Sequence, residues 1–266
     1  MLHHLTLIKG DNEAALLNRY KLVVLECPYE TVSSDQTIDL LGKIIRFKVE
    51  SYRREYRYGI LPFDGVDMVG THYLLCETNA TGGLDPIMGV KTVTQNKCQE
   101  FNLKHPVLGL LGKNPEYANH VKTMEALLDE HNRRNCNLGY FGSWTIRGDV
   151  RKNAELVQFC QRLLAGMALL IADRYDFASI ITVAVSKFKV EGFHKFIGFK
   201  PLANQDNPLP PFISEAMMGE QCSLSFMDKE WFTNDIKMLA SRYKGLWDDR
   251  LEIAAPVSGE DIAKAA

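Results

Sequence analysis

Several features that mark common classes of protein are missing from this sequence of 266 residues. Its 31 basic and 33 acidic side chains nearly balance, so a globally basic surface is absent and no nucleic-acid partner is expected. No segment approaches the roughly 18 to 20 apolar residues that span a bilayer, and we predict no membrane span. The first eight residues lack the basic start and long apolar run of a secretory signal. The expected location is therefore the cytoplasm.

The six cysteines show no Cys-x-x-Cys spacing, and no cysteine or serine lies in a recognisable nucleophile motif. This pattern is typical of reduced thiols in a cytosolic protein rather than of a disulfide framework or a zinc site, and we predict no metal. No polar linker divides the chain, which favours one mixed domain, α/β or α+β. We expect this domain over residues 1–250, with an N-terminal helical region, and a loosely held tail over 251–266.

Apolar residues recur in patterns that predict an alternation of helices and strands. A capping box precedes a long helix over 35–57. The aromatic-rich stretch 138–146 and the β-branched stretch 178–185 indicate strands on either side of a helix over 151–174. Further strands are predicted at 72–78 and 87–94, further helices at 117–131, after 187 and at 229–247, and a loop at the three prolines of 203–211.

The most informative stretch runs from Phe193 to Leu202. Phe193 and Ile197 share one face of a short helix, Gly198 can end that helix, and a strand follows. This sequence resembles the Phe-Tyr-x-x-x-Gly-Phe ending of GNAT-type acyltransferases, with His194 where those enzymes usually carry a tyrosine. The resemblance implies a GNAT-like acyl-CoA N-acyltransferase fold, in which helices flank a central mixed sheet. It also places His194 at the catalytic position.

Upstream motifs recur in the order found in one branch of that superfamily. They are Arg46-Phe47-Lys48-Val49, Asp64-Gly-Val-Asp67, His72-Tyr73-Leu74-Leu75 and Gly89. The order is similar to acyl-homoserine-lactone synthases and, more closely, to long-chain N-acyl amino acid synthases, over roughly residues 36–202. The resemblance implies that Arg46, Asp64 and Asp67 bind substrate, the aspartates through an acceptor ammonium. An Asp-Gly turn is the alternative explanation for Asp64.

Two departures from that branch bear on the acceptor. The family arginine near the end of the 87–94 strand is missing, and Lys91 lies only nearby. The Glu-x-Ser-Arg signature of the lactone synthases is also missing, because Tyr140 and Ser143 stand at its glutamate and arginine positions. Homoserine lactone is therefore disfavoured as the acceptor.

A donor-binding loop is predicted where the 151–174 helix begins. GNAT enzymes hold a pyrophosphate on backbone N–H groups at a helix start, in an Arg-x-x-Gly-x-Gly/Ala loop, and the positive helix end favours the anion. Here the glycines are replaced, and an acidic side chain is added, but we expect the amides to remain available. The alternative is that the basic side chains only solvate a helix end. The predicted donor-binding residues are Arg147, Arg151, Lys152, Asn153, Ala154, Glu155 and Leu156.

Acyl transfer needs a neutral amine, a polarised thioester carbonyl and a proton for the departing thiolate. His194 is the predicted proton donor, because imidazole titrates near neutral pH; a packing histidine is the alternative. Tyr140 and Asp149 are candidates for the base by position, and an ordered water is the alternative to both. Trp144 is assigned to substrate binding, although it could equally line the core.

These patterns predict an N-acyltransferase that moves an acyl group from a thioester donor to a small amine or amino acid by direct attack. The donor is either acyl-CoA or an acyl carrier protein, and an acidic carrier protein could dock on the basic residues of 43–57. The same basic residues are also explained as a solvated helix face. The alternative function is a catalytically degenerate GNAT-like domain that binds an acyl donor, a small ligand or a protein partner.

Overall fold

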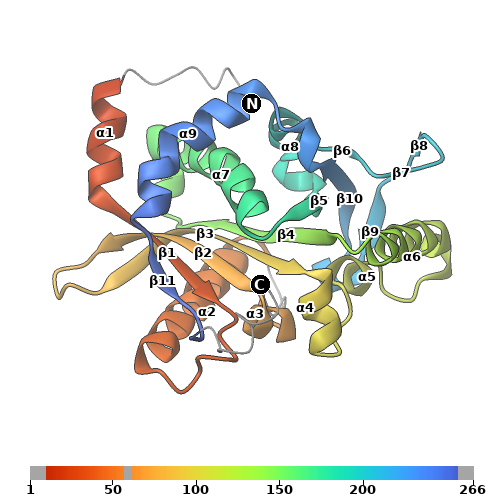
Figure 1. Ribbon diagram of the computed structural model, residues 1–266, viewed down its shortest axis with the longest axis horizontal. Coiled ribbons are helices and arrows are strands. Elements are labelled where there is room, and N and C mark those ends of the chain that lie inside the picture. Colours follow the sequence, from red (N-terminus) through yellow and green to blue (C-terminus); the bar gives the residue numbers. More distant parts are fainter. Residues whose placement is uncertain (1–9, 57–61, 257–266) are drawn as a thin grey trace.

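A mixed nine-stranded sheet forms the centre of the molecule in the computed structural model, which describes residues 10–56 and 62–256 (Figure 1). The strand order is β11-β1-β2-β3-β4-β5-β10-β6, and β9 pairs with β10. Only β1/β11 and β4/β5 are parallel pairs. The strands are β1 Tyr20–Glu26, β2 Thr71–Thr78, β3 Leu84–Thr94, β4 Asn137–Ile146, β5 Phe177–Val185, β6 Lys200–Pro201, β9 Phe212–Ser214, β10 Glu220–Asp228 and β11 Leu251–Ile253.

Helices cover both faces of this sheet (Figure 1). One face carries α1 Gly10–Arg19, α7 Ala154–Arg174, α8 Glu191–Ile197 and α9 Asn234–Asp248, and the other carries α2 Asp35–Glu55, α3 Gly65–Val69 and α4 Gln95–Glu100. Beside the start of β4 lie α5 Pro106–Leu111 and α6 Ala118–Arg133. The short 3-10 turns are η1 Pro115–Tyr117, η2 Val150–Lys152, η3 Ser186–Phe188, η4 Glu215–Met217 and η5 Lys229–Trp231. This arrangement confirms the predicted central mixed sheet flanked by helices.

The long helix α7 is the centre of the core. Its side chains Phe159, Leu163 and Met167 are fully buried, and α9 crosses it so closely that Gly166 faces the backbone of Leu239. By its length and apolar composition alone, α7 could cross a membrane. The prediction that no segment is long and apolar enough to span a bilayer was therefore wrong for this helix. More than half of the apolar window is buried inside the protein, as in the core helix of a globular fold.

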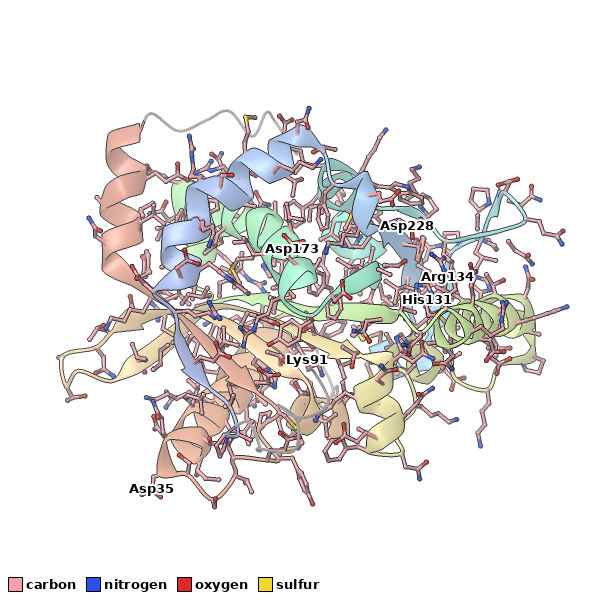
Figure 2. The ribbon with its side chains drawn as sticks, viewed as in Figure 1. Asp35, Lys91, His131, Arg134, Asp173 and Asp228 are labelled. Atoms are coloured by element: carbon pink, nitrogen blue, oxygen red, sulfur yellow. The ribbon has the colours of Figure 1, made fainter. Side chains whose placement is uncertain are left out.

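A buried polar chain connects α6 to the sheet (Figure 2). Ser179 on β5 donates a hydrogen bond to Asp228 Oδ1 at 2.7 Å, and its Oγ lies 3.0 Å from Nε2 of His131. His131 Nδ1 lies 2.8 Å from the carbonyl oxygen of Leu127. Buried polar groups in folded proteins are almost always hydrogen-bonded, as these are. The bonds hold α6 against β5 and β10.

Four strands of the sheet, β1, β9, β10 and β11, were not predicted, and the two longest of them, β1 and β10, contain short apolar runs with few turn signals. Strand β1 lies inside the predicted N-terminal helical region, and β10 follows the prolines of 203–211. That predicted loop itself contains a small hairpin of Ala203–Asn204 (β7) and Asn207–Pro208 (β8). Gln205 and Asp206 both have positive φ, the conformation that a two-residue hairpin turn requires.

The expectation of a loose tail from Leu251 was wrong for the described part of that segment. Leu251 and Ile253 pair in parallel with Val23 and Leu25 of β1, and Ile253 is buried. Unpaired backbone groups on β1 would otherwise face solvent at the sheet edge, so pairing satisfies them. Residues 257–266 lie outside the described residues, and the division of the chain into one domain and a tail otherwise stays a prediction.

The neighbouring strands β4 and β5 separate halfway along their length. Their pairing ends at Phe141 and Thr182, although β4 continues to Ile146 on β3 and β5 continues to Val185 on β10. A bulge in β4 accompanies the separation, and Ser143 there has a φ of 57°. Bulges bend a strand and increase its twist, which here turns the end of β4 away from β5. A gap through the sheet results.

Candidate functional site

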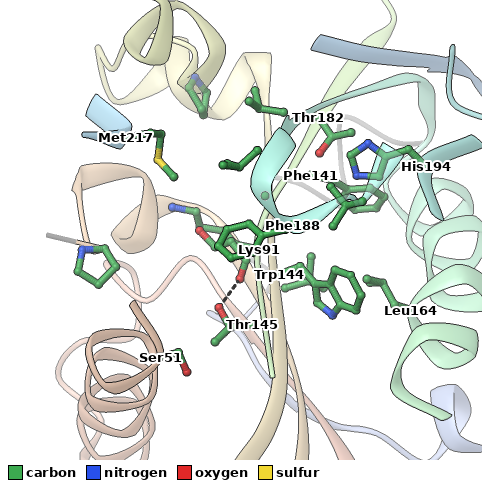
Figure 3. A pocket seen from close by; sticks show the side chains of 18 of the residues that line it. Ser51, Lys91, Phe141, Trp144, Thr145, Leu164, Thr182, Phe188, His194 and Met217 are labelled. Atoms are coloured by element: carbon green, nitrogen blue, oxygen red, sulfur yellow. Dashed lines mark hydrogen bonds between the residues drawn. The ribbon is translucent and has the colours of Figure 1, made fainter. Parts of the chain in front are cut away.

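A cavity of about 880 Å³ passes through the gap between β4 and β5. It is lined from both faces of the sheet, as Figure 3 shows with His194 and Leu164 on one side and Ser51 and Met217 on the other. The first side is formed by α7 and α8 and is mostly apolar, whereas the second side is formed by α2, α3, α5 and η4 and ends in charged groups. Two substrates could therefore enter from opposite faces and meet between the strands.

His194 lines the cavity, but its protonation state in the free protein differs from that of the predicted proton donor. Its Nδ1 lies 3.3 Å from Oγ of Ser225 on β10, and its ring packs against Phe199. Burial lowers the pKa of His194 to about 4. At pH 7 roughly one molecule in a thousand would then carry the imidazolium, so the ring is neutral when substrate arrives. A neutral imidazole is suited to accept a proton first rather than to donate one.

Tyr140 and Trp144 also line the cavity. Burial raises the pKa of Tyr140 above its ordinary value, so the phenol stays protonated at neutral pH and is poorly suited to the predicted role of base. Its ring covers Gly142, where any Cβ would collide with the phenol. Trp144 stacks on Phe193 with ring centroids 5.1 Å apart. Its indole Nε1 is buried and has no hydrogen-bond partner among the described residues, so it can donate to a ligand.

Asp149 and Arg147, which were predicted as site residues, do not line the cavity. Asp149 accepts two hydrogen bonds from the Arg147 guanidinium, at 2.7 and 2.9 Å, and Arg147 also pairs with Glu77 on β2. The bonds from Arg147 hold the pKa of Asp149 at about 2, which makes this carboxylate a weak base. Arg147 is fully engaged by these acidic partners. The structure therefore does not support a role for Asp149 in catalysis or for Arg147 in donor binding.

The predicted phosphate loop is closed by its own side chain. Oδ1 of Asn153 accepts the backbone N–H groups of Glu155 at 3.0 Å and Leu156 at 3.2 Å, which caps helix α7. The expectation that these amides remain available was therefore wrong, because an N-cap side chain satisfies the same donors that would bind an anion. Of the seven predicted donor-binding residues, Arg151 is the one that lines the cavity in the described part of the chain.

A buried ion cluster forms the polar end of the cavity. The Asp67 side chain is 1% exposed and contacts Nζ of Lys48 and, at 3.1 Å, Nζ of Lys91. Burial opposes ionisation of Asp67, but Lys91 and Lys48 together hold its pKa well below the ordinary value. Burial lowers the pKa of Lys48 to about 8. His72 Nε2 lies 2.7 Å from the Asp67 carbonyl oxygen, and burial lowers the pKa of His72 to about 4, so this ring is neutral.

The two predicted aspartates therefore have different roles. Asp67 is saturated by its two lysines, so it fixes their positions rather than binding an acceptor ammonium. Asp64 caps α3, because its Oδ1 accepts the N–H groups of Val66 and Asp67. Its side chain is 65% exposed and lines the cavity, which leaves room for an additional cation. Lys91 bridges the pair, since its Nζ also lies 3.4 Å from Asp64 Oδ1.

Arg46 is exposed and does not line the cavity among the described residues, so its predicted role in substrate binding is not supported. Lys48 supplies the helix cation instead. Two positions along a helix turn the side chain by about 200°, which places these residues on opposite faces. Lys48 lies on the buried face with Ile44 and Ser51, and a lysine within an apolar stripe was the signal that sequence analysis missed. The contributions of Lys91, Ser225 and Lys187 were missed because their partners are distant in sequence.

Comparison with solved structures identifies similar folds. The CoA-dependent acyl-homoserine lactone synthase BjaI, solved with SAM and isopentyl-CoA, aligns with a TM-score of 0.52 and 12% identity, over 93% of this chain and 100% of that chain. FeeM, an N-acyl amino acid synthase from uncultured soil microbes, aligns with a TM-score of 0.47 and 11% identity, over 80% and 94% of the two chains. No protein-family model and no curated protein sequence matches. The alignment with BjaI shows that this chain has a GNAT-like acyltransferase fold.

Proposed function

We propose that the protein is an N-acyltransferase that moves an acyl group from a thioester donor to the amine of a small acceptor. The observation that carries this proposal is the cavity that crosses the sheet between β4 and β5. An apolar side on α7 and α8 suits the arm and acyl chain of a donor, and a charged side on α2 and α3 suits a polar acceptor. The likeness of the fold to BjaI, a CoA-dependent acyl-homoserine lactone synthase, supports the same reaction class.

The reaction we propose is a direct attack without a covalent enzyme intermediate. The amine nitrogen forms a bond to the thioester carbonyl carbon, and neutral His194 accepts the proton that this nitrogen loses. The C–S bond then breaks, and the imidazolium so formed gives its proton to the departing thiolate. His194 therefore acts first as base and then as acid; its low pKa in the free protein leaves the ring unprotonated before the attack and makes the imidazolium a good proton donor to the thiolate. The unpaired Nε1 of Trp144 can hydrogen-bond a polar group of the donor.

The charged end of the cavity fits an amino acid better than a simple amine. Asp64 can hold the acceptor ammonium before it releases one proton to solvent and attacks as the neutral amine, and Lys91, which is 5% exposed, can bind a carboxylate. Lys48 and Lys91 carry two positive charges against the single buried carboxylate of Asp67, because His72 is neutral and Asp64, the other acidic partner of Lys91, is 65% exposed to solvent. A buried excess of positive charge is stabilised by an incoming anion, and the acceptor carboxylate can supply it.

Donor identity and location are narrower proposals. Both acyl-CoA and an acyl carrier protein present a thioester on the same phosphopantetheine arm, so the cavity is compatible with either. All six cysteines are unpaired, as expected in a reducing compartment, and we place the protein in the cytoplasm on that basis.

A second function has one specific observation in its favour. The start of α7 is capped by Asn153, so a domain that binds an acylated ligand or a partner without catalysis is an alternative. The experiment that separates the two measures thiol release from decanoyl-CoA and decanoyl carrier protein with a panel of amino acids and amines. Thiol release with an N-acylated product in the mass spectrum supports the enzyme. Donor binding without thiol release from any acceptor supports the binding domain.

A further inference from the structure

The end of helix α2 crosses the mouth of the cavity, where it contacts the segments that follow both separated strands. After β4, Arg151 places Nη1 2.5 Å from Oε1 of Glu55, and its Nε donates to the carbonyl oxygen of Ile146 at 2.8 Å. After β5, Lys187 donates to the backbone carbonyl of the same Glu55 at 3.3 Å. Glu55, Arg151 and Lys187 all line the cavity. Glu55 therefore contacts two cations that come from the two sides of the gap, Arg151 through its carboxylate and Lys187 through its backbone carbonyl.

Each cation is held in place by further contacts. Lys187 pairs with Glu220 Oε1 at 2.6 Å, and its ammonium lies 3.6 Å from the centre of the Tyr56 ring. Arg151 is fixed by its bond to Ile146, so its remaining guanidinium N–H groups keep a defined direction. The two cations would keep these positions if the Glu55 carboxylate moved away.

The start of α7, by contrast, offers little to an anion. Asn153 accepts the N–H groups of Glu155 and Leu156, the two donors that an N-terminal anion would use. A donor phosphate would have to displace this cap, which removes two hydrogen bonds from the helix. At the mouth of the cavity, displacement of the Glu55 side chain alone frees Arg151, while Lys187 keeps its contact with Glu220 and remains beside it. The Arg151 and Glu55 side chains are 38% and 32% exposed, and ion pairs with that much solvent contact are weak.

We propose that Arg151 and Lys187 form the site for the phosphate of the donor's phosphopantetheine arm, and that Glu55 occupies this site in the free protein. The proposal rests on the proposed function, since it assigns a part of the same donor. A phosphate carries more acceptor oxygens than a carboxylate and can take hydrogen bonds from both cations at once. Glu55 is then an intramolecular competitor, and donor binding swings its side chain out of the mouth. The phosphopantetheine phosphate is common to CoA and carrier protein.

The test compares two probes that differ only in the phosphate: decanoyl-pantetheine 4′-phosphate and decanoyl-pantetheine. Binding is measured by calorimetry without an acceptor, so it does not depend on turnover. We expect the wild-type protein to bind the phosphorylated probe about tenfold more tightly, and Arg151→Gln or Lys187→Gln to remove most of that preference. Glu55→Gln should tighten binding of the phosphorylated probe about three- to tenfold and leave the other probe unchanged.

Two control variants make the test selective. Glu50→Gln removes the same charge from an exposed position of α2 and should leave both affinities unchanged. Asn153→Ala frees the amides of α7 and should also leave the preference for phosphate unchanged. A Glu55→Gln variant that binds the phosphorylated probe no better than wild type would overturn the proposal, as would tighter binding in Asn153→Ala. Circular dichroism at the assay temperature shows whether each variant is folded, and Arg151→Lys serves as a second variant at that position.

The outcomes for this site and for the proposed function differ. If N-acyl product forms but the preference for phosphate is the same in Glu55→Gln, Arg151→Gln and wild type, the site is wrong and the function stands. If neither probe binds, the site is overturned, and thiol release decides the function separately. The same variants tested with decanoyl-CoA and with decanoyl carrier protein identify the donor source. The donor that Glu55→Gln binds more tightly than the wild type does is the donor whose phosphate uses this site.

Discussion

Nδ1 of His194 lies 3.3 Å from the hydroxyl oxygen of Ser225, which joins a residue of α8 to a buried position on β10. This contact directs one ring nitrogen away from the cavity, so the other can face the reacting groups (Figure 3). A serine hydroxyl can donate or accept, and it therefore supports the neutral ring and also the imidazolium formed during the reaction.

His194 should be essential for turnover and dispensable for donor binding. We expect His194→Gln or His194→Phe to lower kcat by about 10² to 10⁴, because proton transfer by a positioned side chain contributes that much. The dissociation constant for decanoyl-CoA should stay within about twofold of wild type, since in the proposed mechanism the ring contacts the reacting thioester and not the phosphate. Steady-state kinetics measure kcat, and calorimetry measures the dissociation constant. Unchanged kcat would remove His194 from the mechanism.

Ser225 should act through His194 as a positioning residue. We expect Ser225→Ala to lower kcat about tenfold with little change in KM, and Ser225→Thr to restore most of the loss because it keeps the hydroxyl. The pKa of His194, followed by NMR, should lie near 4 in the wild type and shift in Ser225→Ala but not in Ser225→Thr. An identical titration in all three proteins would show that Ser225 has only a packing role.

Stability should fall in mild acid because three histidines are buried in the neutral form. Burial lowers the pKa values of His72, His105 and His194 to about 4, whereas in the unfolded chain they have the ordinary value of 6.5. Between these values the unfolded chain binds more protons, so the free energy of unfolding decreases as pH falls from about 6.5 to about 4. His194→Phe should lose less stability over that range than the wild type. Urea unfolding at pH 7 and pH 5 measures the difference.

Lys48 should matter far more to folding than Arg46, although the two lie close together in the sequence. Lys48→Met leaves the Asp67 carboxylate buried with one partner fewer, and breaking a buried pair costs about 3 to 5 kcal/mol of unfolding free energy. Arg46→Ala is the matched control, because an exposed substitution changes stability by about 0.5 kcal/mol or less. Equal effects in urea unfolding would contradict the assignment of Lys48 to the buried cluster.

Lys91 should discriminate acceptors by their carboxylate. With Lys91→Met we expect KM for an amino acid to rise about tenfold, because the acceptor carboxylate loses one charged hydrogen bond. KM for the corresponding amino acid amide should change little. The amide is the internal control, because it keeps the attacking amine and the side chain. A parallel rise for both acceptors would show that Lys91 supports the site only through Asp67 and Asp64.

Much of the fold was predictable from local pattern. The β4–α7–β5–α8 series, with Gly198 at the end of α8, follows from apolar periodicity and turn residues. Strand β11 was not predictable in this way, because its three residues form a strand only by pairing with the open edge of β1. Local pattern also could not show that β4 and β5 separate, since this depends on which residues pair across the sheet.

The candidate site was predictable only where a residue's role depends on its own chain neighbourhood. His194 and Arg151, selected by their positions relative to α8 and α7, both line the cavity, and their roles stay predictions. Arg147 and Asp149 were misplaced because Arg147 turns toward Glu77, which is distant in sequence. Asn153 could have been recognised as a helix cap, because asparagine before a helical run is a strong N-cap signal.

The pairing of β11 with β1 has a consequence for self-association. At that side of the sheet the last strand is only three residues long, and its Glu252 is paired with Arg174 and Arg250. A short, charged final strand offers few free N–H and C=O groups to another molecule. Removal of this segment would uncover the β1 residues that it pairs with, Val23, Val24 and Leu25, as a template for sheet extension between copies. The segment from Leu251 to Ile253 thus helps to keep copies of this protein apart.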